Sequence, residues 1–178
     1  YQYVAGRLIN YHLRKQVYET FEPPCLCDIV QDNIDAGFYD PEFTELFTKE
    51  EINELQSFID HSRDEYLTYA AMEQFRGKYL VQNRATGEIF ETPQVAYMMI
   101  AATLFAKYPA DTRMSYIKRY YDAISRFKIS LPTPVMAGVR TPQRQFSSCV
   151  LIETDDSLDS INATSSAIVK YVSQKAGI

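Results

Sequence analysis

The sequence predicts a mainly helical region with one β-hairpin, followed by the first strand and helix of an α/β domain. Three observations indicate this order. Apolar residues recur at helical spacings through most of residues 1–127, and β-rich stretches flank a glycine-containing turn near residue 85. Near residue 150, a short apolar run leads into a polar turn and a long amphipathic stretch. We expect the helical region to end near residue 144.

Composition narrows the class of protein. The 178 residues suit one domain or one domain plus part of another, and 46% hydrophobic residues disfavour disorder. A net charge of −5 disfavours nucleic-acid binding, although a pocket for single nucleotides remains possible. We expect no membrane association, because no apolar run reaches spanning length. An odd cysteine count of three and no leader peptide favour the cytoplasm, and the missing initiator Met indicates a piece of a longer chain.

Six helices are expected before residue 128. The first carries Val4, Leu8, Tyr11 and Tyr18 on one face and ends at the prolines that follow Phe21. The second covers residues 26–36. The third follows a capping box at residues 48–51, and the fourth covers residues 64–76. Beyond the hairpin of residues 78–91, further helices are expected at residues 93–107 and 111–127.

The last third of the chain changes character. Residues 128–144 have no period and three prolines, which is typical of a functional loop or of a linker between domains. Residues 145–153 read as a strand covered on both faces. A helix with a narrow apolar seam follows, carrying Leu158, Ile161, Ser165, Ile168 and Val172 and ending at Gly177.

Few residues in the sequence are of a type that by itself suggests a catalytic, metal-binding or ligand-binding role. Cys25 and Cys27 lack further ligands at metal-binding spacing, so we interpret them as small hydrophobes and expect no metal site. Cys149 is either an inert core residue or a reactive thiol at the end of a strand. The turn at residues 156–157 either caps a helix or binds a ligand through a sugar hydroxyl. His12 and Lys15 form a small cationic patch or a solvated face.

Four motifs then point to a family. They are FKISLPTPVM at residues 127–136, GVRTP at 138–142, RQFSSC at 144–149 and DSLDSI at 156–161. Together they resemble the large, catalytic subunit of class I aerobic ribonucleotide reductases. The resemblance implies the N-terminal part of such a subunit, ending before its active site is complete. It divides the chain into the last helix of an ATP-cone (residues 1–20), a helical domain (21–144) and the first β/α unit of a ten-stranded α/β barrel (145–178).

The resemblance also implies roles for individual residues. Cys149 matches one member of a redox cysteine pair that reduces the ribose 2′ carbon after a thiyl radical on another cysteine takes the 3′ hydrogen. The radical cysteine and the pair's partner belong to later strands, so the isolated chain is expected to be inactive. The positions that match substrate-binding residues are Thr133, Ser148, Ala176 and Gly177.

Two allosteric sites are implied in the same way. Asp156, Ser157 and Leu158 match the specificity site, where a deoxynucleoside triphosphate selects the base that is reduced. Tyr11, His12 and Lys15 match part of the overall activity site for ATP and dATP, most of which precedes Tyr1.

The implied partners are a small subunit that generates the radical, thioredoxin or glutaredoxin as reductant, a ribonucleoside diphosphate substrate, and a second large subunit that packs along the helix of residues 158–175. No cofactor is expected in this chain, since the metal and tyrosyl radical belong to the small subunit. The competing hypothesis is a non-catalytic helical module that binds nucleotides or proteins, or a split-gene piece completed by another chain.

Overall fold

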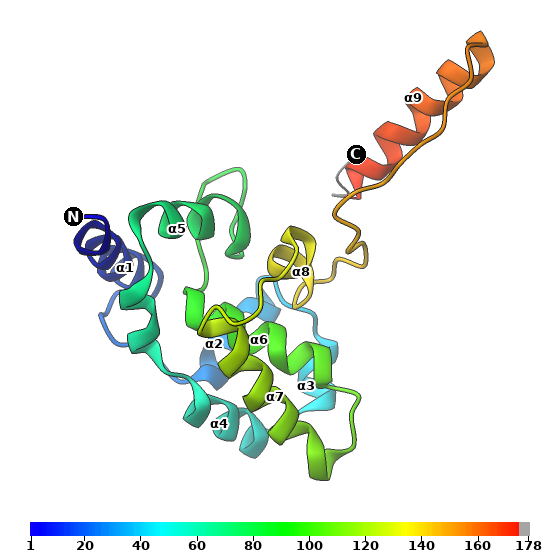
Figure 1. The fold of residues 1–178 in the computed structure, drawn as a ribbon. Coiled ribbons are helices and arrows are strands. Elements are labelled where there is room, and N and C mark those ends of the chain that lie inside the picture. The colour runs from blue at the N-terminus through cyan, green and yellow to red at the C-terminus, as the bar shows by residue number, and fades with distance from the viewer. Residues whose placement is uncertain (175–178) are drawn as a thin grey trace.

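A computed structural model describes residues 1–174 as a helical body from which an arm projects (Figure 1). The elements of the body, in chain order, are α1 (Gln2–Tyr18), α2 (Leu26–Asp35), α3 (Glu42–Leu46), α4 (Lys49–Phe58), the 3₁₀ helix η1 (His61–Tyr66), α5 (Tyr69–Gln74), the π-helical turn η2 (Phe75–Tyr79), α6 (Pro93–Phe105), α7 (Ala110–Ser125) and α8 (Thr133–Gly138). The arm contains α9 (Leu158–Ser173). Within residues 1–174, no helix is long and apolar enough to cross a membrane.

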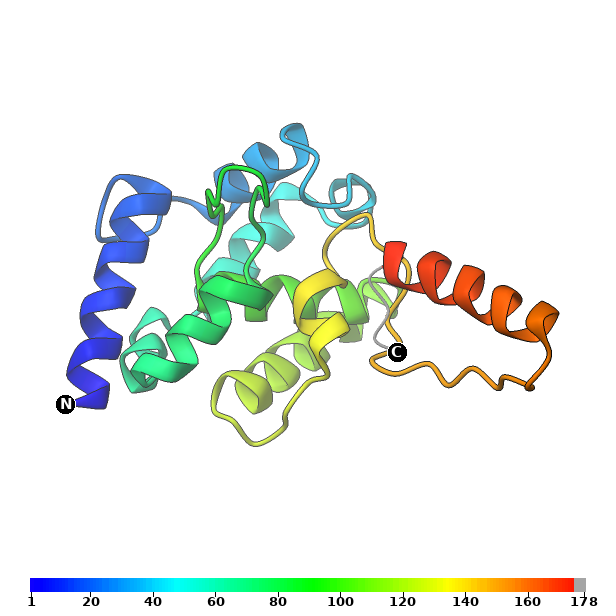
Figure 2. The same cartoon turned by 90° about the horizontal axis from the view of Figure 1, so that it is seen from above.

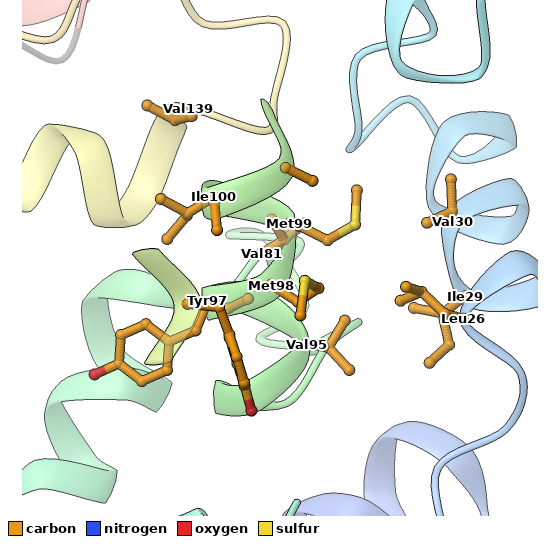
Figure 3. Packing of buried hydrophobic residues seen from close by; sticks show 14 of the residues in the cluster. Leu26, Ile29, Val30, Val81, Val95, Tyr97, Met98, Met99, Ile100 and Val139 are labelled. Atoms are coloured by element: carbon orange, nitrogen blue, oxygen red, sulfur yellow. The ribbon is translucent and has the colours of Figure 1, made fainter. Parts of the chain in front are cut away.

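Helix α6 forms the centre of the core. Its residues from Pro93 to Ala102 are all buried, so it is surrounded on every side rather than amphipathic. It packs against α7 and α8, and its side chains face Leu26, Ile29 and Val30 of α2 on one side and Val139 on the other (Figure 3). This central helix confirms the prediction of a buried apolar helix near residues 93–107.

Helix α4 begins where the sequence predicts. The Thr48 side chain accepts a hydrogen bond from the Glu51 amide at 3.3 Å, and the Glu51 carboxylate accepts one from the Thr48 amide at 2.9 Å. This capping box satisfies two amides that would otherwise lack partners at the start of the helix. Helix α4 packs against α2 and α7, and therefore closes one side of the body.

Helix α1 exposes three of the four residues on its predicted apolar face, whereas the fourth, Tyr18, is half-buried against the core. Val4, Leu8 and Tyr11 face solvent, whereas the opposite face buries Gly6 and Leu13 against η1 and α5. The neighbours require glycine at position 6, since a Cβ there would lie 2.1 Å from the Leu67 carbonyl oxygen. The close approach of the α1 backbone to Leu67 decides which face of the helix is buried. The spacing of apolar residues in the sequence does not reveal such an approach.

Three predicted boundaries are wrong in detail. Residues 64–76 do not form one helix, because Leu67 is extended and Thr68 caps a new helix by accepting a bond from the Ala71 amide. Gly77 lies within the π-helical turn and does not end a helix. The aperiodic stretch 128–144 contains the short helix α8, which begins at Thr133 with a proline in its first turn.

The predicted strands are not formed in the part of the chain that the structure describes. Residues 78–91 do reverse direction, but they pair through a single antiparallel bridge between Gln82 and Ile89. Residues 145–153 are extended without a ladder partner. A parallel strand needs neighbouring strands on its edges, and no strand lies within residues 1–174 to supply them.

The arm consists of this extended segment and α9, which run side by side and away from the body (Figures 1 and 2). The two are joined by contacts such as the 2.7 Å hydrogen bond between the Thr154 and Thr164 hydroxyls. No residue of α9 is buried, and Leu151 is 97% exposed. The apolar seam of α9 therefore faces solvent in this chain.

Candidate functional site

A hollow of about 880 Å³ opens on the body where the arm begins. Its walls come from the turn after α2, the segment from η2 into the chain reversal, and α8 with the loop after it. The end of α9 completes the rim. The lining residues are Gly37, Phe38, Gly77, Lys78, Leu80, Val81, Gln82, Arg84, Thr133, Pro134, Ala137, Thr141, Pro142, Gln143, Arg144, Ser173 and Gln174.

A buried ionic cluster joins these walls. Arg140, which follows α8, is paired with Glu91, and both side chains are completely buried. The same carboxylate accepts hydrogen bonds from the Tyr39 hydroxyl at 2.5 Å and the Val81 amide at 2.7 Å. Arg140 also donates to the main-chain oxygens of Met136 and Tyr79. Charge buried in this way is costly to disturb, so the cluster holds the three walls in one arrangement.

The environment within the cluster raises the pKa of two of its members, Tyr39 and Arg140. Burial, then the adjacent Glu91 charge, raises the pKa of Tyr39 well above its ordinary value, so the phenol remains a neutral donor. Burial alone would lower the pKa of Arg140, but the Glu91 carboxylate more than offsets this and raises it. The Arg140 cation and the neutral Tyr39 phenol therefore both donate to the Glu91 carboxylate that joins the walls.

The hollow is positively charged although the chain is acidic. Lys78, Arg84 and Arg144 line it, and no Asp or Glu is among the described residues of the lining. Arg84 donates to the main-chain oxygens of Gly77 and Lys78, and Arg144 pairs with Asp40. Polar groups such as the Thr133 hydroxyl add donors. A cationic recess of this kind favours an anionic polar ligand.

The structure places one predicted substrate residue at the hollow and leaves others outside it. Thr133 is exposed at the start of α8 and lines the hollow. Ser148 and Cys149 are exposed in the extended part of the arm and are absent from the lining as far as residue 174. The thiol therefore does not face the recess that Thr133 lines. Ala176 and Gly177 lie outside the described residues.

The three predicted specificity-site residues lie together at the far end of the arm. Ser157 caps α9 by accepting a hydrogen bond from the Ser160 amide at 3.2 Å, and the Asp156 amide donates to Asp155. Leu158 is 80% exposed. The capping role that the sequence allows is thus formed, and the same turn is accessible to a ligand.

The three predicted activity-site residues share the exposed part of α1. Tyr11, His12 and Lys15 are all exposed. The Phe21 ring folds back over this surface, with its centroid 6.1 Å from that of Tyr11 and 5.6 Å from the Lys15 ammonium. In both ribbon views α1 and the arm lie at opposite ends of the molecule (Figures 1 and 2). The structure therefore separates the predicted activity site on α1 from the specificity site on the arm, and it divides the predicted substrate residues between the hollow and the arm.

Sequence reasoning missed the residues that shape the hollow. The sequence pattern predicts Glu91 in a hairpin strand and indicates no role for Tyr39 or Arg140. The one available signal is an arginine inside the otherwise uncharged GVRTP motif. An isolated charge among apolar residues and glycine needs a buried partner, but sequence does not identify which of 23 acidic residues supplies it. No group of three metal-ligating side chains occurs within the described residues.

Comparison with known proteins decides the family. Residues 65–144, which contain α5 to α8 and the Glu91–Arg140 pair, match the family described as "Ribonucleotide reductase, all-alpha domain". The whole chain is 62% identical to ribonucleoside-diphosphate reductase 1 subunit alpha of Escherichia coli (strain K12). This chain belongs to the ribonucleotide reductase large-subunit family. It is also 61% identical to the subunit alpha of Haemophilus influenzae and 50% identical to that of Enterobacteria phage T4.

These similarities cover the chain completely but the relatives only in part. All 178 residues align, and they span 23% of the length of the Escherichia coli relative and 24% of that of the phage T4 relative. The similarity therefore assigns the family, and the chain spans about a quarter of the length of these relatives.

Proposed function

We propose that this chain forms part of a ribonucleoside-diphosphate reductase, an enzyme that converts ribonucleoside diphosphates to 2′-deoxyribonucleoside diphosphates. The observation that carries the proposal is the 62% identity over all 178 residues to a subunit alpha of that name. The aligned region covers all 178 residues, so it includes both the helical body and the arm.

In the proposed reaction, Cys149 is one of two thiols that reduce the ribose. Its thiol and that of a partner cysteine supply two electrons and become a disulfide, while the 2′ hydroxyl leaves as water and a hydrogen takes its place. Another cysteine, as a thiyl radical, first removes the 3′ hydrogen and later returns one. Both of those cysteines lie outside this chain. The exposed position of Cys149 in a segment without strand partners is compatible with a strand that is completed by further barrel strands.

The charge of the hollow supports a nucleoside diphosphate as the substrate. Thr133 can donate to a substrate oxygen from the rim, and the lining cations favour a diphosphate. Ser148, Ala176 and Gly177 are proposed to contact the same substrate. The apolar residues of the arm are exposed in this chain, and burying them against further barrel segments would be favourable.

The remaining assignments follow the same proposal. The turn of Asp156, Ser157 and Leu158 is proposed to bind a deoxynucleoside triphosphate effector, and Tyr11, His12 and Lys15 to form part of a site for ATP or dATP. The exposed seam of α9 is proposed to pack against a second large subunit. The radical-generating small subunit, a thioredoxin or glutaredoxin reductant and a cytoplasmic location belong to the proposal as well.

A chimaera tests the proposal. This chain would replace the corresponding 178 residues of the Escherichia coli subunit alpha, and reduction of a ribonucleoside diphosphate would be measured with the small subunit present. We expect the chimaera to be active and its Cys149→Ala variant to lose turnover while still binding the diphosphate. Full turnover by Cys149→Ala would exclude Cys149 as a reductant. A folded chimaera that binds substrate without any turnover would argue against the reductase assignment itself.

The isolated chain distinguishes this proposal from a non-catalytic module. Because the radical cysteine lies outside it, we expect no reduction by the 178 residues alone, even with the small subunit added. Product formation by the isolated chain would show that our account of the missing cysteines is wrong. Inactivity of the chain alone together with an active chimaera would exclude a purely non-catalytic role.

A further inference from the structure

Two cysteines that the reductase proposal does not use lie together at the start of α2. Cys25 is the N-cap residue of α2 and Cys27 lies in its first turn. Their sulfur atoms point at the same acceptor, Asn53 Oδ1 on α4, at 3.9 Å and 3.3 Å respectively. The Cys27 sulfur also lies 3.9 Å from the Lys49 carbonyl oxygen. Both side chains are half-buried and neither forms a disulfide.

The surrounding structure holds this pair in place. The Leu26 amide, between the two cysteines, donates to the Gln56 side chain of α4 at 2.9 Å. The Cys25 carbonyl accepts from the amides of Asp28 and Ile29 at 3.0 Å and 3.1 Å. Helices α2 and α4 pack directly against each other. The two thiols are therefore presented from a fixed turn rather than from a loose loop.

We propose that Cys25 and Cys27 form a two-thiolate site for a soft monovalent cation of the Cu(I) class. Thiolates select such ions, whereas carboxylates and carbonyls select hard cations. A tetrahedral Zn²⁺ site needs four protein ligands or three with a water, and no such set occurs among the residues that the structure describes. Two sulfurs suffice for an ion that accepts two-coordinate ligation. The pairing of the thiols over one oxygen, rather than the Cys-Leu-Cys spacing alone, carries the proposal.

The binding step is an exchange of protons for metal, without a change of oxidation state. Two S–H bonds break, two S–Cu bonds form, two protons leave to water, and copper remains Cu(I). Binding is therefore expected to release protons at neutral pH.

The test is an anaerobic titration of the chain with Cu(I) against bicinchoninate as a coloured competitor. Cys149→Ser serves as the background, because it removes the exposed thiol of the arm and leaves α2 intact. We expect one Cu(I) per chain to be taken from the competitor, with release of about two protons in weakly buffered solution. Cys25→Ser and Cys27→Ser, each in that background, are expected to lose this site while keeping their helical circular dichroism.

Three results would overturn the proposal. One is an absence of Cu(I) uptake by the folded Cys149→Ser chain. Another is uptake that survives both single substitutions, which would place the metal elsewhere. The third is loss of the site in only one of the two single variants, which would show that the metal does not need both thiols. The chimaera assay measures turnover that depends on Cys149, whereas the copper titration depends on Cys25 and Cys27 in a Cys149→Ser background, so either proposal can fail without the other.

Discussion

The body and the arm differ in what determines their shape. In residues 1–144, buried apolar side chains surround α6 and buried ion pairs join distant segments. In residues 145–173, no residue of α9 is buried, and its contacts with the extended segment are exposed hydrogen bonds such as the one between Thr154 and Thr164. The proposed reductant, Cys149, belongs to the second region, and the cationic hollow belongs to the first.

In this chain the body holds the hollow and Thr133 in position, whereas the arm carries the proposed reductant, Cys149. The body has the buried contacts needed to hold Thr133 and the hollow in place without help. The arm lacks such contacts, so its apolar residues gain burial only from something outside the described chain. The body should therefore respond strongly to substitution, and the arm should tolerate it.

The largest expected effect is at the ion pair behind the hollow. Arg140→Leu leaves the buried Glu91 carboxylate without its cation, which should lower the free energy of unfolding by about 3–5 kcal/mol. Urea denaturation followed by circular dichroism measures this loss. The double variant Glu91→Leu with Arg140→Leu should regain much of it, because neither charge is then left buried alone. A loss below 1 kcal/mol in the single variant would mean that the pair does not hold the body.

A smaller effect is expected where α1 meets the body. Gly6→Ala places a methyl group 2.1 Å from the Leu67 carbonyl oxygen. Because this oxygen belongs to the main chain, the clash can be relieved only by a shift of the backbone. We expect a loss of about 1–3 kcal/mol in unfolding free energy from the forced shift of α1. Gly77→Ala is the matched control, because nothing lies within 4 Å of a Cβ at that position. Equal stability of the two variants would show that α1 does not pack this closely.

Where α1 meets the body, two titratable groups should make the free energy of unfolding depend on pH in opposite directions. Burial raises the pKa of Asp64 to about 7, so its contribution to stability is present at about pH 4 and is lost as the pH rises to 7. Burial, then the charge of Arg14, lowers the pKa of His61 from 6.5 to about 4, so its contribution grows as the pH rises between those values. The two slopes largely cancel between pH 4 and 6.5.

Single substitutions should reveal each slope. Relative to the unaltered chain, Asp64→Asn should gain stability as the pH rises, and His61→Gln should lose it, by up to about 1.4 kcal/mol per pH unit. Urea midpoints at pH 4.5, 5.5 and 6.5 measure both trends. Parallel curves for all three proteins would contradict the buried state of these groups.

The smallest effect is expected in the arm. Ile168→Ser, on the exposed seam of α9, should change the unfolding free energy of the body by less than about 0.5 kcal/mol. The same denaturation experiment provides the measurement. Limited proteolysis should also cut the exposed segment 145–157 before it cuts the body. A destabilisation comparable with that of Gly6→Ala would mean that the arm is part of the folded core.

Local signals in the sequence predicted much of this chain. The capping box at Thr48, the buried helix that begins at Pro93 and the helix that begins at Leu158 are formed as expected, because each depends on residues close together in sequence. The motifs from residue 127 onward predicted the family correctly. The proposed roles of Cys149 and the nucleotide sites remain predictions.

Contacts between distant residues were decided by tertiary structure alone. The buried face of α1 follows from the close approach of Gly6 to Leu67, and the walls of the hollow are joined by Glu91 and Arg140, which are 49 residues apart. The strand expected at residues 145–153 depends on neighbouring strands in the same way, since an extended segment completes its hydrogen bonds only on another chain segment. Periodicity reports which residues can be buried, but only packing decides which partners bury them.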